Sequence, residues 1–324
     1  MKRLARRIAT LVTALTATLT FSALAQPYPE KSITLVVPFS VGGSTDIASR
    51  ILAQELTTSL GKTVVVENRT GGGGVIGWGS VAKAAPDGYT LLTLELSYAI
   101  AAGLIPTLPY DPKTAFVQAG TAVSMPHVQV VHPGVKASTI QEFVALAKAN
   151  PGKLNYGSGG SGTNTHLGSE LLKSLAGIDM VHVPYKGAGA VLQDLMAGQV
   201  QALIASLPTI LPHVRSGKLR GLMVLAETRS SHLPGVPSAK EAGYPGMVMA
   251  FWVGVAAPAG TPKPVIDKLN REIVAALQKP AMKTRLNDLG LDAVGNTPAQ
   301  ATKLVEDEIK RWGAVIKAAN IKAD

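Results

Sequence analysis

The sequence contains the same strand–loop–helix plan twice, and this repetition constrains the fold more than any other feature. In the first copy, VVPFSVGGSTDI at residues 36–47, an apolar run passes through glycines and hydroxyl residues into an amphipathic segment at 47–60. In the second, LNYGSGGSGTNTH at 154–166, the same order leads into a helix expected over 163–176. We therefore predict two α/β lobes that face each other across a cleft.

Apolar runs and helical periodicities alternate along the rest of the chain, which is typical of α/β layers with parallel strands and right-handed crossovers. Further strands are expected at residues 33–37, 63–66, 89–92, 128–131, 180–183, 200–204, 221–225 and 253–256. Further helices are expected at 140–149 and 188–196, from Thr261 onward, and over a last segment in which Val305, Ile309, Trp312 and Ile316 share one face.

The first loop has the residues of an anion site. Gly42 and Gly43 permit close approach of the backbone to a ligand, and Ser44 and Thr45 are favourable N-cap residues. The free N–H groups of the first helical turn carry a partial positive charge, so we predict that this loop holds an anionic group. The alternative is a capped turn that binds nothing. Asp46 is interpreted as a first-turn charge favoured by the helix dipole.

The second loop offers neutral hydrogen-bond donors at another helix start. These are Ser158, Ser161, Thr163 and Asn164, and His166 follows in the first turn. Two opposed helix N-termini could hold both ends of a dicarboxylate without an arginine. His166 either contacts the ligand or packs and caps the helix.

A glycine-rich stretch at residues 71–77 matches the dinucleotide-binding fingerprint, because Gly72, Gly74 and Gly77 have the G-x-G-x-x-G spacing and Glu95 ends a later strand. Residues 67–70 separate the preceding strand from the first glycine, whereas the fingerprint needs that glycine in the turn directly after the strand. We therefore favour a structural or ligand-lining glycine loop.

Catalytic and metal chemistry find little support in the sequence. Neither Ser158 nor Ser161 lies in a G-x-S-x-G motif, and the six histidines show no H-x-H or H-x-x-x-H spacing. The chain has no cysteine, which excludes thiol chemistry and zinc–thiolate sites. The net charge of +10 is scattered, with no basic run interleaved with aromatic residues. We predict no cofactor, no metal and no nucleic-acid partner.

The first 25 residues have the pattern of a cleaved signal peptide. A basic region at residues 2–7 precedes an apolar stretch at 8–24, and Ala-Leu-Ala at 23–25 forms a cleavage site before Gln26. An uncleaved membrane anchor is the alternative, which the cleavage site and the small residues disfavour. We expect the chain to be exported.

Several motifs together carry a family resemblance. They are VVPFSVGGSTD (36–46), VVVENRTGGGG (64–74), AAPDGYTLL (84–92), LPYDP (108–112), NPGKLNYGSGGSGTNTHL (150–167), VHVPYKG (181–187), LPHVRSGKLRGL (211–222) and APAGTPKPV (257–265). With them the chain resembles the Bug solute-binding proteins, the extracytoplasmic receptors of tripartite tricarboxylate transporters in Gram-negative bacteria.

The resemblance implies a type II periplasmic binding protein with mainly parallel sheets. Its first lobe would comprise residues 26–124 and 228–324, and its second lobe residues 125–227. The lobes would close on a small, usually carboxylate-bearing solute, which is then passed to a membrane permease.

The resemblance also implies a ligand site between the lobes. The first lobe would contribute Phe39, Ser40, Val41, Gly42, Gly43, Ser44 and Thr45, with Ser97 from a loop around residues 95–98. The second lobe would contribute Ser158, Gly162, Thr163, Asn164, His166 and Ala205.

Two positions depart from the family pattern. Ala205 begins an Ala-Ser-Leu-Pro run where many relatives have Asp-Asn-Leu-Pro, so an acid that could hold a ligand amine is absent and amino-acid solutes are disfavoured. Glu95 stands in a loop that in relatives is mostly Gly, Ser and Thr. A carboxylate there must be paired, protonated or turned away. Phe39, Phe251 and Trp252 could add an apolar wall, although Phe251 and Trp252 fit core or hinge positions better.

We therefore expect a non-enzymatic, monomeric periplasmic receptor for a mono- or dicarboxylate, aromatic ones included. It would bind by lobe closure and deliver the ligand to the permease subunits of a tripartite transporter. The alternative is an exported enzyme that acts on a carboxylate or an ester.

Overall fold

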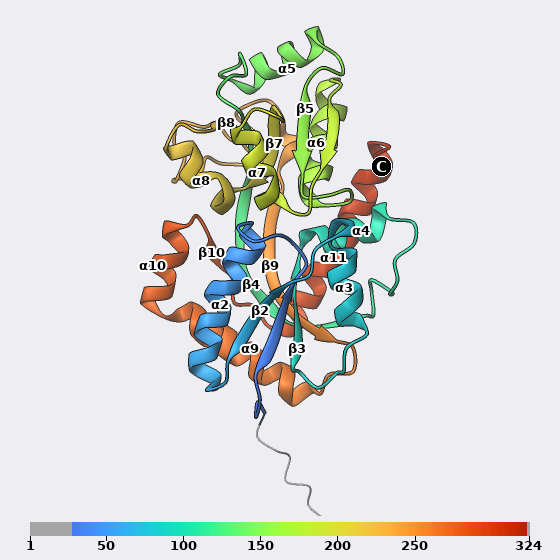
Figure 1. Ribbon diagram of the computed structural model, residues 1–324, viewed down its shortest axis with the longest axis vertical. Coiled ribbons are helices and arrows are strands. Elements are labelled where there is room, and N and C mark those ends of the chain that lie inside the picture. The colour runs from blue at the N-terminus through green and yellow to red at the C-terminus, as the bar shows by residue number, and fades with distance from the viewer. Residues whose placement is uncertain (1–27, 323–324) are drawn as a thin grey trace, which may run out of the picture. The chain divides into compact units, whose positions relative to one another are not determined.

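Two groups of parallel strands are joined by one long antiparallel strand, β4 (Phe116–Val131) (Figure 1). The computed structural model describes residues 28–322, and residues from Lys31 onward form one body. The predicted signal peptide at residues 1–25 lies outside the described residues. The fold class is confirmed: the chain is an α/β protein with two lobes, drawn below and above the middle of Figure 1.

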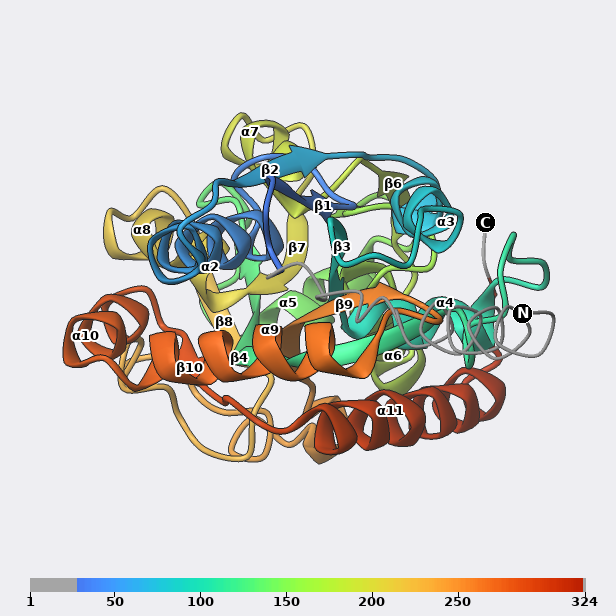
Figure 2. The same cartoon turned by 90° about the horizontal axis from the view of Figure 1, so that it is seen from below.

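In the first lobe, β1 (Ile33–Val37) lies between β2 (Val64–Asn68) and β3 (Thr90–Glu95) and pairs with both in parallel. The run ITLVV is almost wholly buried, as expected for a parallel strand covered on both faces. Helix α2 (Ser44–Leu60) packs on β1 and β2, whereas α9 (Lys263–Gln278) and α11 (Pro298–Ala318) pack against β4 (Figure 2). A capping box between Thr297 and Gln300 fixes the start of α11.

In the second lobe, β5 (Asn155–Ser158) lies between β6 (Val181–Pro184) and β7 (Ala202–Ser206), again in parallel. Strand β8 (Arg220–Val224) pairs antiparallel with β4. The helices of this lobe are α5 (Ile140–Ala149), α6 (Asn164–Ala176), α7 (Ala188–Met196) and α8 (Leu207–Arg215).

The remaining elements of the described residues complete the first lobe and the connections. They are η1 (Gly72–Gly74), α3 (Val75–Ala82), α4 (Leu96–Leu104), η2 (Pro245–Met247), β9 (Ala250–Pro258), α10 (Pro280–Asp288) and β10 (Asp292–Ala293). No helix between residues 28 and 322 is long and apolar enough to cross a membrane.

Strand β4 changes partners along its length, which is how it links the lobes. Residues 116–126 pair with β9, and residues 127–131 pair with β7. Only 128–131 was expected as a strand, because Gly120 and Pro126 are typical strand breakers. Gly120 lies at a register shift with φ +149°, and Pro126 lies where the partner strand changes, so the sheet tolerates both. The parallel pairing predicted from the sequence thus holds within each lobe and gives way to antiparallel pairing at β4 and β9.

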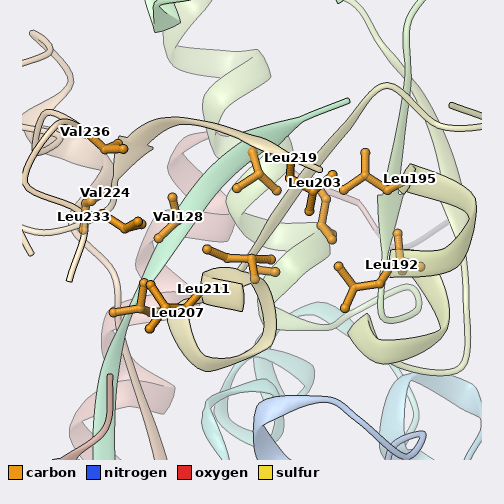
Figure 3. Packing of buried hydrophobic residues seen from close by; sticks show 14 of the residues in the cluster. Val128, Leu192, Leu195, Leu203, Leu207, Leu211, Leu219, Val224, Leu233 and Val236 are labelled. Atoms are coloured by element: carbon orange, nitrogen blue, oxygen red, sulfur yellow. The ribbon is translucent and has the colours of Figure 1, made fainter. Parts of the chain in front are cut away.

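The second lobe is held together by a hydrophobic cluster that involves β4, β7, α7 and α8 (Figure 3). Leu192 and Leu195 of α7 approach Leu203 of β7, and Leu207 and Leu211 of α8 close the other side. Since these side chains are nearly fully buried, the cluster forms a close-packed core between α7, α8 and the sheet of the second lobe.

Leu195→Ala is expected to lower the free energy of unfolding by about 2–5 kcal/mol, because it removes a fully buried side chain and leaves a cavity. The matched control is Leu175→Ala on α6, where the side chain is 50% exposed, and its effect should stay within about 0.5 kcal/mol. Chemical denaturation measures both values; equal effects would contradict the packing in Figure 3.

Candidate functional site

The starts of α2 and α6 lie on the same small cavity of about 30 Å³, which we call the cleft cavity. Its walls come from both lobes. The lining residues are Phe39, Gly43, Ser44, Thr45, Glu95, Ser97, Gly159, Thr163, Asn164, Thr165, Ala188, Ser206 and Phe251. The two loops that the sequence singled out are therefore brought together.

Ser44, the first residue of α2, bonds to the other lobe. Its N–H donates to Oγ1 of Thr209 at 2.9 Å, and the hydroxyl of Ser206 donates to its side-chain oxygen. Ser206 is the N-cap of α8 and Thr209 lies in the first turn of that helix. The start of α2 is thus bonded to the start of α8 across the cleft.

Asn164, the first residue of α6, makes the reciprocal bonds. Its N–H donates to Oγ of Ser97 at 3.0 Å, and its side-chain amide donates to Oε2 of Glu95 at 2.9 Å. Glu95 is the N-cap of α4 and Ser97 lies in its first turn. The two halves of the site therefore follow one plan, in which a helix start bonds to an N-cap and a first-turn hydroxyl of the opposite lobe.

These bonds use the first N–H group of each helix and leave the second one for a ligand. The second positions are Thr45 in α2 and Thr165 in α6, and both line the cleft cavity. The N–H groups of a first helical turn have no acceptor within the helix and carry a partial positive charge. The geometry therefore suits an anionic group on either side.

Asp46 supports the first loop from below. It accepts hydrogen bonds from the Gly42 N–H at 3.1 Å and the Asn68 amide at 2.9 Å, and it forms an ion pair with Arg50 at 2.9 Å. Burial acts to raise the pKa of Asp46, but the bonds from Arg50, Asn68 and Gly42 outweigh it and lower the pKa below the usual value. Asp46 is thus an ionised structural group, in agreement with the first-turn charge predicted from the sequence.

Glu95 is fully buried in the wall of the cleft cavity. Its Oε2 atom accepts from the Ser97 N–H at 2.8 Å and from Asn164, whereas its Oε1 atom has no partner. Burial raises the pKa of Glu95 from 4.5 to about 7, against the bonds from Ser97 and Asn164, which lower it. The sequence left three alternatives for this carboxyl group: paired, protonated or turned away. Among the described residues it is not paired with a cation, and it is not turned away from the cavity.

His127 on β4 stands behind Asn164 and fixes the direction of its amide. The Nε2 atom of His127 lies 3.0 Å from Oδ1 of Asn164, so the Asn164 amide nitrogen faces Glu95 and Ser97. Burial lowers the pKa of His127 to about 4, against its bond to Asn164. His127 is therefore neutral at physiological pH and adds no positive charge to the site.

Other predicted site residues lie at the rim or in the contact between lobes. Val41 is 63% exposed, and Gly42 is also exposed. The Ser40 N–H donates to the carbonyl of Lys186 at 3.0 Å. Gly162 faces Ile105, whose side chain lies 3.2 Å from where a Cβ would stand.

Like these four residues, three further predicted residues do not line the cleft cavity. The Ser158 hydroxyl bonds to His182, and His166 stacks on the His182 ring at 4.3 Å. Ala205 belongs to the hydrophobic cluster of the second lobe, because alternate residues of β7 face opposite sides. The cleft position is taken by the next residue, Ser206.

The helix starts differ from the sequence-based prediction in two respects. The N-cap of α2 is Gly43, so the prediction of Ser44 or Thr45 as the cap was wrong; their side chains are available to the cleft instead. Residues 95–98, predicted as a loop, begin α4 with Glu95 as its N-cap. The mostly apolar composition of residues 96–104 hid this short helix, since a run with so few polar residues shows no amphipathic period.

Glycines let the two lobes meet backbone to backbone. A Cβ on Gly189 would stand 2.5 Å from the Val41 carbonyl oxygen, and one on Gly73 would stand 2.2 Å from that of Ser161. The glycine-rich stretch at 71–77 therefore serves the contact between lobes, which agrees with the structural interpretation made from the sequence.

Of the aromatic candidates, Phe39 and Phe251 line the cleft cavity and Trp252 does not. Phe39 packs edge-on against Trp78, with ring centroids 6.2 Å apart. Phe251 packs edge-on against His127 at 5.1 Å. The two phenylalanines therefore give the cleft an apolar side next to its polar helix starts.

Ser206, Thr209 and Ala188 contribute to the site and were not predicted. The signal for Ser206 and Thr209 was present, since hydroxyl residues follow the apolar run of β7 as they follow β1 and β5. Pro208 and Pro212 obscured the helix that these residues begin.

No arginine, lysine or histidine lines the cleft cavity in the described part of the chain. Residues 28–322 also contain no group of three His, Asp or Glu side chains able to hold a metal ion. A larger pocket of about 380 Å³ lies beside residues 224–232, but its Arg229 is paired with Glu241. We place the candidate site in the cleft cavity, where both helix starts and the unpartnered Glu95 oxygen meet.

Two α/β lobes with opposed helix starts on one cleft cavity define a two-lobed solute-binding protein. Residues 48–321 match the model of the tripartite tricarboxylate transporter family receptor, TctC. The chain belongs to this family, and it is a periplasmic solute-binding receptor of the TctC/Bug type.

Individual relatives agree with this assignment. Protein BugT of Bordetella pertussis is 41% identical over 300 residues, which cover 92% of this chain and 92% of BugT. The structure of R. palustris Rpa4515 with adipate has a TM-score of 0.88 and 34% identity, and covers 91% of this chain and 99% of that one. MatC (Rpa3494) from Rhodopseudomonas palustris with bound malate has a TM-score of 0.86 and 34% identity, over 89% and 100% of the two chains.

Glu95→Gln is expected to stabilise the protein at high pH. Because the pKa of Glu95 is raised in the folded state, the folded protein holds this proton more tightly than the unfolded chain. Stability that is present below about pH 4.5 is therefore lost as the pH rises through about 7, by about 3 kcal/mol at full ionisation.

Chemical denaturation at about pH 4.5 and about pH 8.5 measures this loss. It should occur in the wild type and in the exposed control Glu306→Gln, and be absent in Glu95→Gln. Equal losses in all three proteins would mean that Glu95 titrates normally.

Proposed function

We propose that this receptor captures a small carboxylate in the cleft cavity and delivers it to the membrane permease of a tripartite transporter. The observation that carries the proposal is the reciprocal pair of helix starts, whose second residues, Thr45 and Thr165, line one cavity from opposite lobes. Adipate and malate, bound by two structural relatives, are carboxylates at both ends. Such a ligand could bridge the two starts.

The proposed ligand site combines the predicted residues Phe39, Gly43, Ser44, Thr45, Ser97, Thr163 and Asn164 with Glu95, Thr165, Ser206 and Phe251. Phe39 and Phe251 would contact the carbon skeleton of the ligand, aliphatic or aromatic. We propose that Ser158, His166 and Ala205 support the second lobe rather than contact the ligand.

We propose that binding works by closure of the lobes predicted from the sequence, residues 26–124 with 228–324 against residues 125–227. The change of partner strands near Pro126 supports the first boundary. A ligand that touches both lobes only in the closed state shifts the population toward that state, and the permease recognises the closed receptor. Before this, the predicted signal peptide would direct the chain to the periplasm, where it acts as a monomer.

The proposal includes no catalytic step. A serine–histidine hydrogen bond does exist between Ser158 and His182, but Ser158 is fully buried and does not line the cleft cavity. A nucleophile must reach the substrate, so this pair has a packing role in the proposed function.

Ser44→Phe is expected to abolish binding of malate and adipate, because the larger side chain fills the cleft cavity and blocks the bond to Ser206. The ligand-free melting temperature should change little, since the lobes can separate. The matched control is Ser59→Phe, at an exposed position near the end of the same helix. Isothermal calorimetry and thermal shift measure both effects; unchanged affinity in Ser44→Phe would place the ligand elsewhere.

Gly189→Ala is expected to weaken ligand binding by at least about tenfold by opposing closure. Its φ lies outside the left-handed region, so the cost comes from clashes with the first loop across the cleft, at the Val41 carbonyl oxygen (2.5 Å) and the Gly43 nitrogen (2.9 Å). Gly313→Ala on α11 is the control, because a Cβ there meets nothing within 4 Å. Both substitutions improve helix propensity. If calorimetry gives the same affinity for both variants, closure does not bring Gly189 to Val41.

A further inference from the structure

Glu95 is an acid in a cavity that otherwise suits anions, and the proposed function gives it no task. Its Oε2 atom accepts from the Ser97 N–H and the Asn164 amide at 2.8 and 2.9 Å. A carboxyl oxygen that accepts from two N–H donors has both of its in-plane lone pairs in use and has none left to carry a proton. Any proton on this carboxyl group therefore sits on Oε1, the buried atom without a partner.

Glu95 occupies the position in its half of the site that Ser206 occupies in the other half. Glu95 caps α4 and bonds to the first residue of α6, just as Ser206 caps α8 and bonds to the first residue of α2. The Ser206 hydroxyl donates to Ser44, whereas Glu95 accepts from Asn164, so the bond runs in the opposite direction at the Glu95 position. A protonated Glu95 presents an O–H group at the equivalent place, whereas an ionised Glu95 presents only acceptors.

Within residues 28–322, no cation pairs with either oxygen of Glu95. The elements around it carry His127 on β4, Tyr98 on α4, Asp46, Arg50 and Glu55 on α2, His166, Glu170 and Lys173 on α6, and Lys303, Glu306, Asp307, Glu308, Lys310, Arg311 and Lys317 on α11. Glu170 pairs with Lys173, Glu55 with Lys279 and Lys303 with Asp307, and Glu306, Lys310 and Lys317 are exposed. His127 is neutral, Asp46 is paired with Arg50, Tyr98 donates to the Pro112 carbonyl, and Arg311 lies 3.7 Å from Glu308. Strands β1 and β9 and helix α3 carry no titratable residue.

We propose that Glu95 is protonated when the closed cleft holds a carboxylate, and that its Oε1–H group donates to an oxygen of that carboxylate. The inference rests on the proposed function and adds proton uptake to it. The proton comes from the solvent and converts the Glu95 carboxylate to a carboxylic acid, and no other bond changes. Two carboxylates in contact without a cation would repel each other, so one of them must hold a proton.

Two consequences follow from this linkage. Above about pH 7, binding takes up close to one proton for each ligand, and affinity falls by up to about tenfold for each further pH unit. The burial that already raises the pKa of Glu95 to about 7 makes this uptake accessible near neutral pH. The receptor therefore selects carboxylates that lack a hydrogen-bond donor at the Glu95 end.

Calorimetric titration with malate and with adipate at about pH 8, in buffers of different ionisation enthalpy, tests the proposal directly. The slope of the observed heat against buffer enthalpy gives the number of protons taken up. We expect close to one proton for the wild type and for Glu306→Gln. Glu95→Gln keeps a neutral donor, so it should bind with no proton uptake and with an affinity that does not change between about pH 6 and about pH 8.5.

The outcomes distinguish a failure of the proposed role of Glu95 from a failure of the proposed carboxylate receptor. Binding by the wild type without proton uptake overturns the role of Glu95 and leaves the carboxylate receptor standing. Loss of binding in Glu95→Gln, together with no proton uptake by the wild type, assigns an ionised Glu95 to a hydroxyl or amine of the ligand and also overturns it. If neither malate nor adipate binds the wild type, while Glu95 titrates normally, both proposals fail for this ligand class.

Discussion

The cross-cleft hydrogen bonds of the two helix starts are the constraint on which the site depends. Each lobe offers one strand–loop–helix start, and each start bonds its first N–H group to a hydroxyl of the other lobe, Thr209 for Ser44 and Ser97 for Asn164. A hydrogen bond between neutral groups contributes only about 1 kcal/mol, but its direction fixes where the next N–H group points. The cleft is therefore aligned by weak bonds.

This alignment needs a backbone approach that only glycine allows. Gly189 comes so close to the Val41 carbonyl, and Gly73 so close to Ser161, that any side chain would hold the lobes apart. Further from the cleft, β4 continues from one sheet into the other and gives both lobes a common strand. The glycine contacts at the cleft and the shared strand β4 behind it together define one closed arrangement of the two lobes.

The sequence predicted the two lobes and the two loops, because glycines and hydroxyl residues directly after a buried strand indicate a strand–loop–helix unit from local sequence alone. Strand β1 and helices α5 and α7 have the predicted bounds, because their apolar residues follow the period of a strand or a helix. Helices α4 and α8 were missed, since the first is mostly apolar and the second contains Pro208 and Pro212. The partner of Glu95, and the side of β7 on which Ala205 lies, depend on contacts between distant segments, which one sequence without its fold does not reveal.

The aromatic residues beside the cleft also provide an intrinsic fluorescence probe. Phe39 lines the cleft cavity and meets the edge of Trp78, which is fully buried and in turn lies 5.5 Å from the ring of Tyr98. Indole emission responds to the packing and polarity immediately around the ring. A solute that moves Phe39 would therefore change the surroundings of Trp78 without touching it. The tryptophan fluorescence of the protein would then report that a solute is bound.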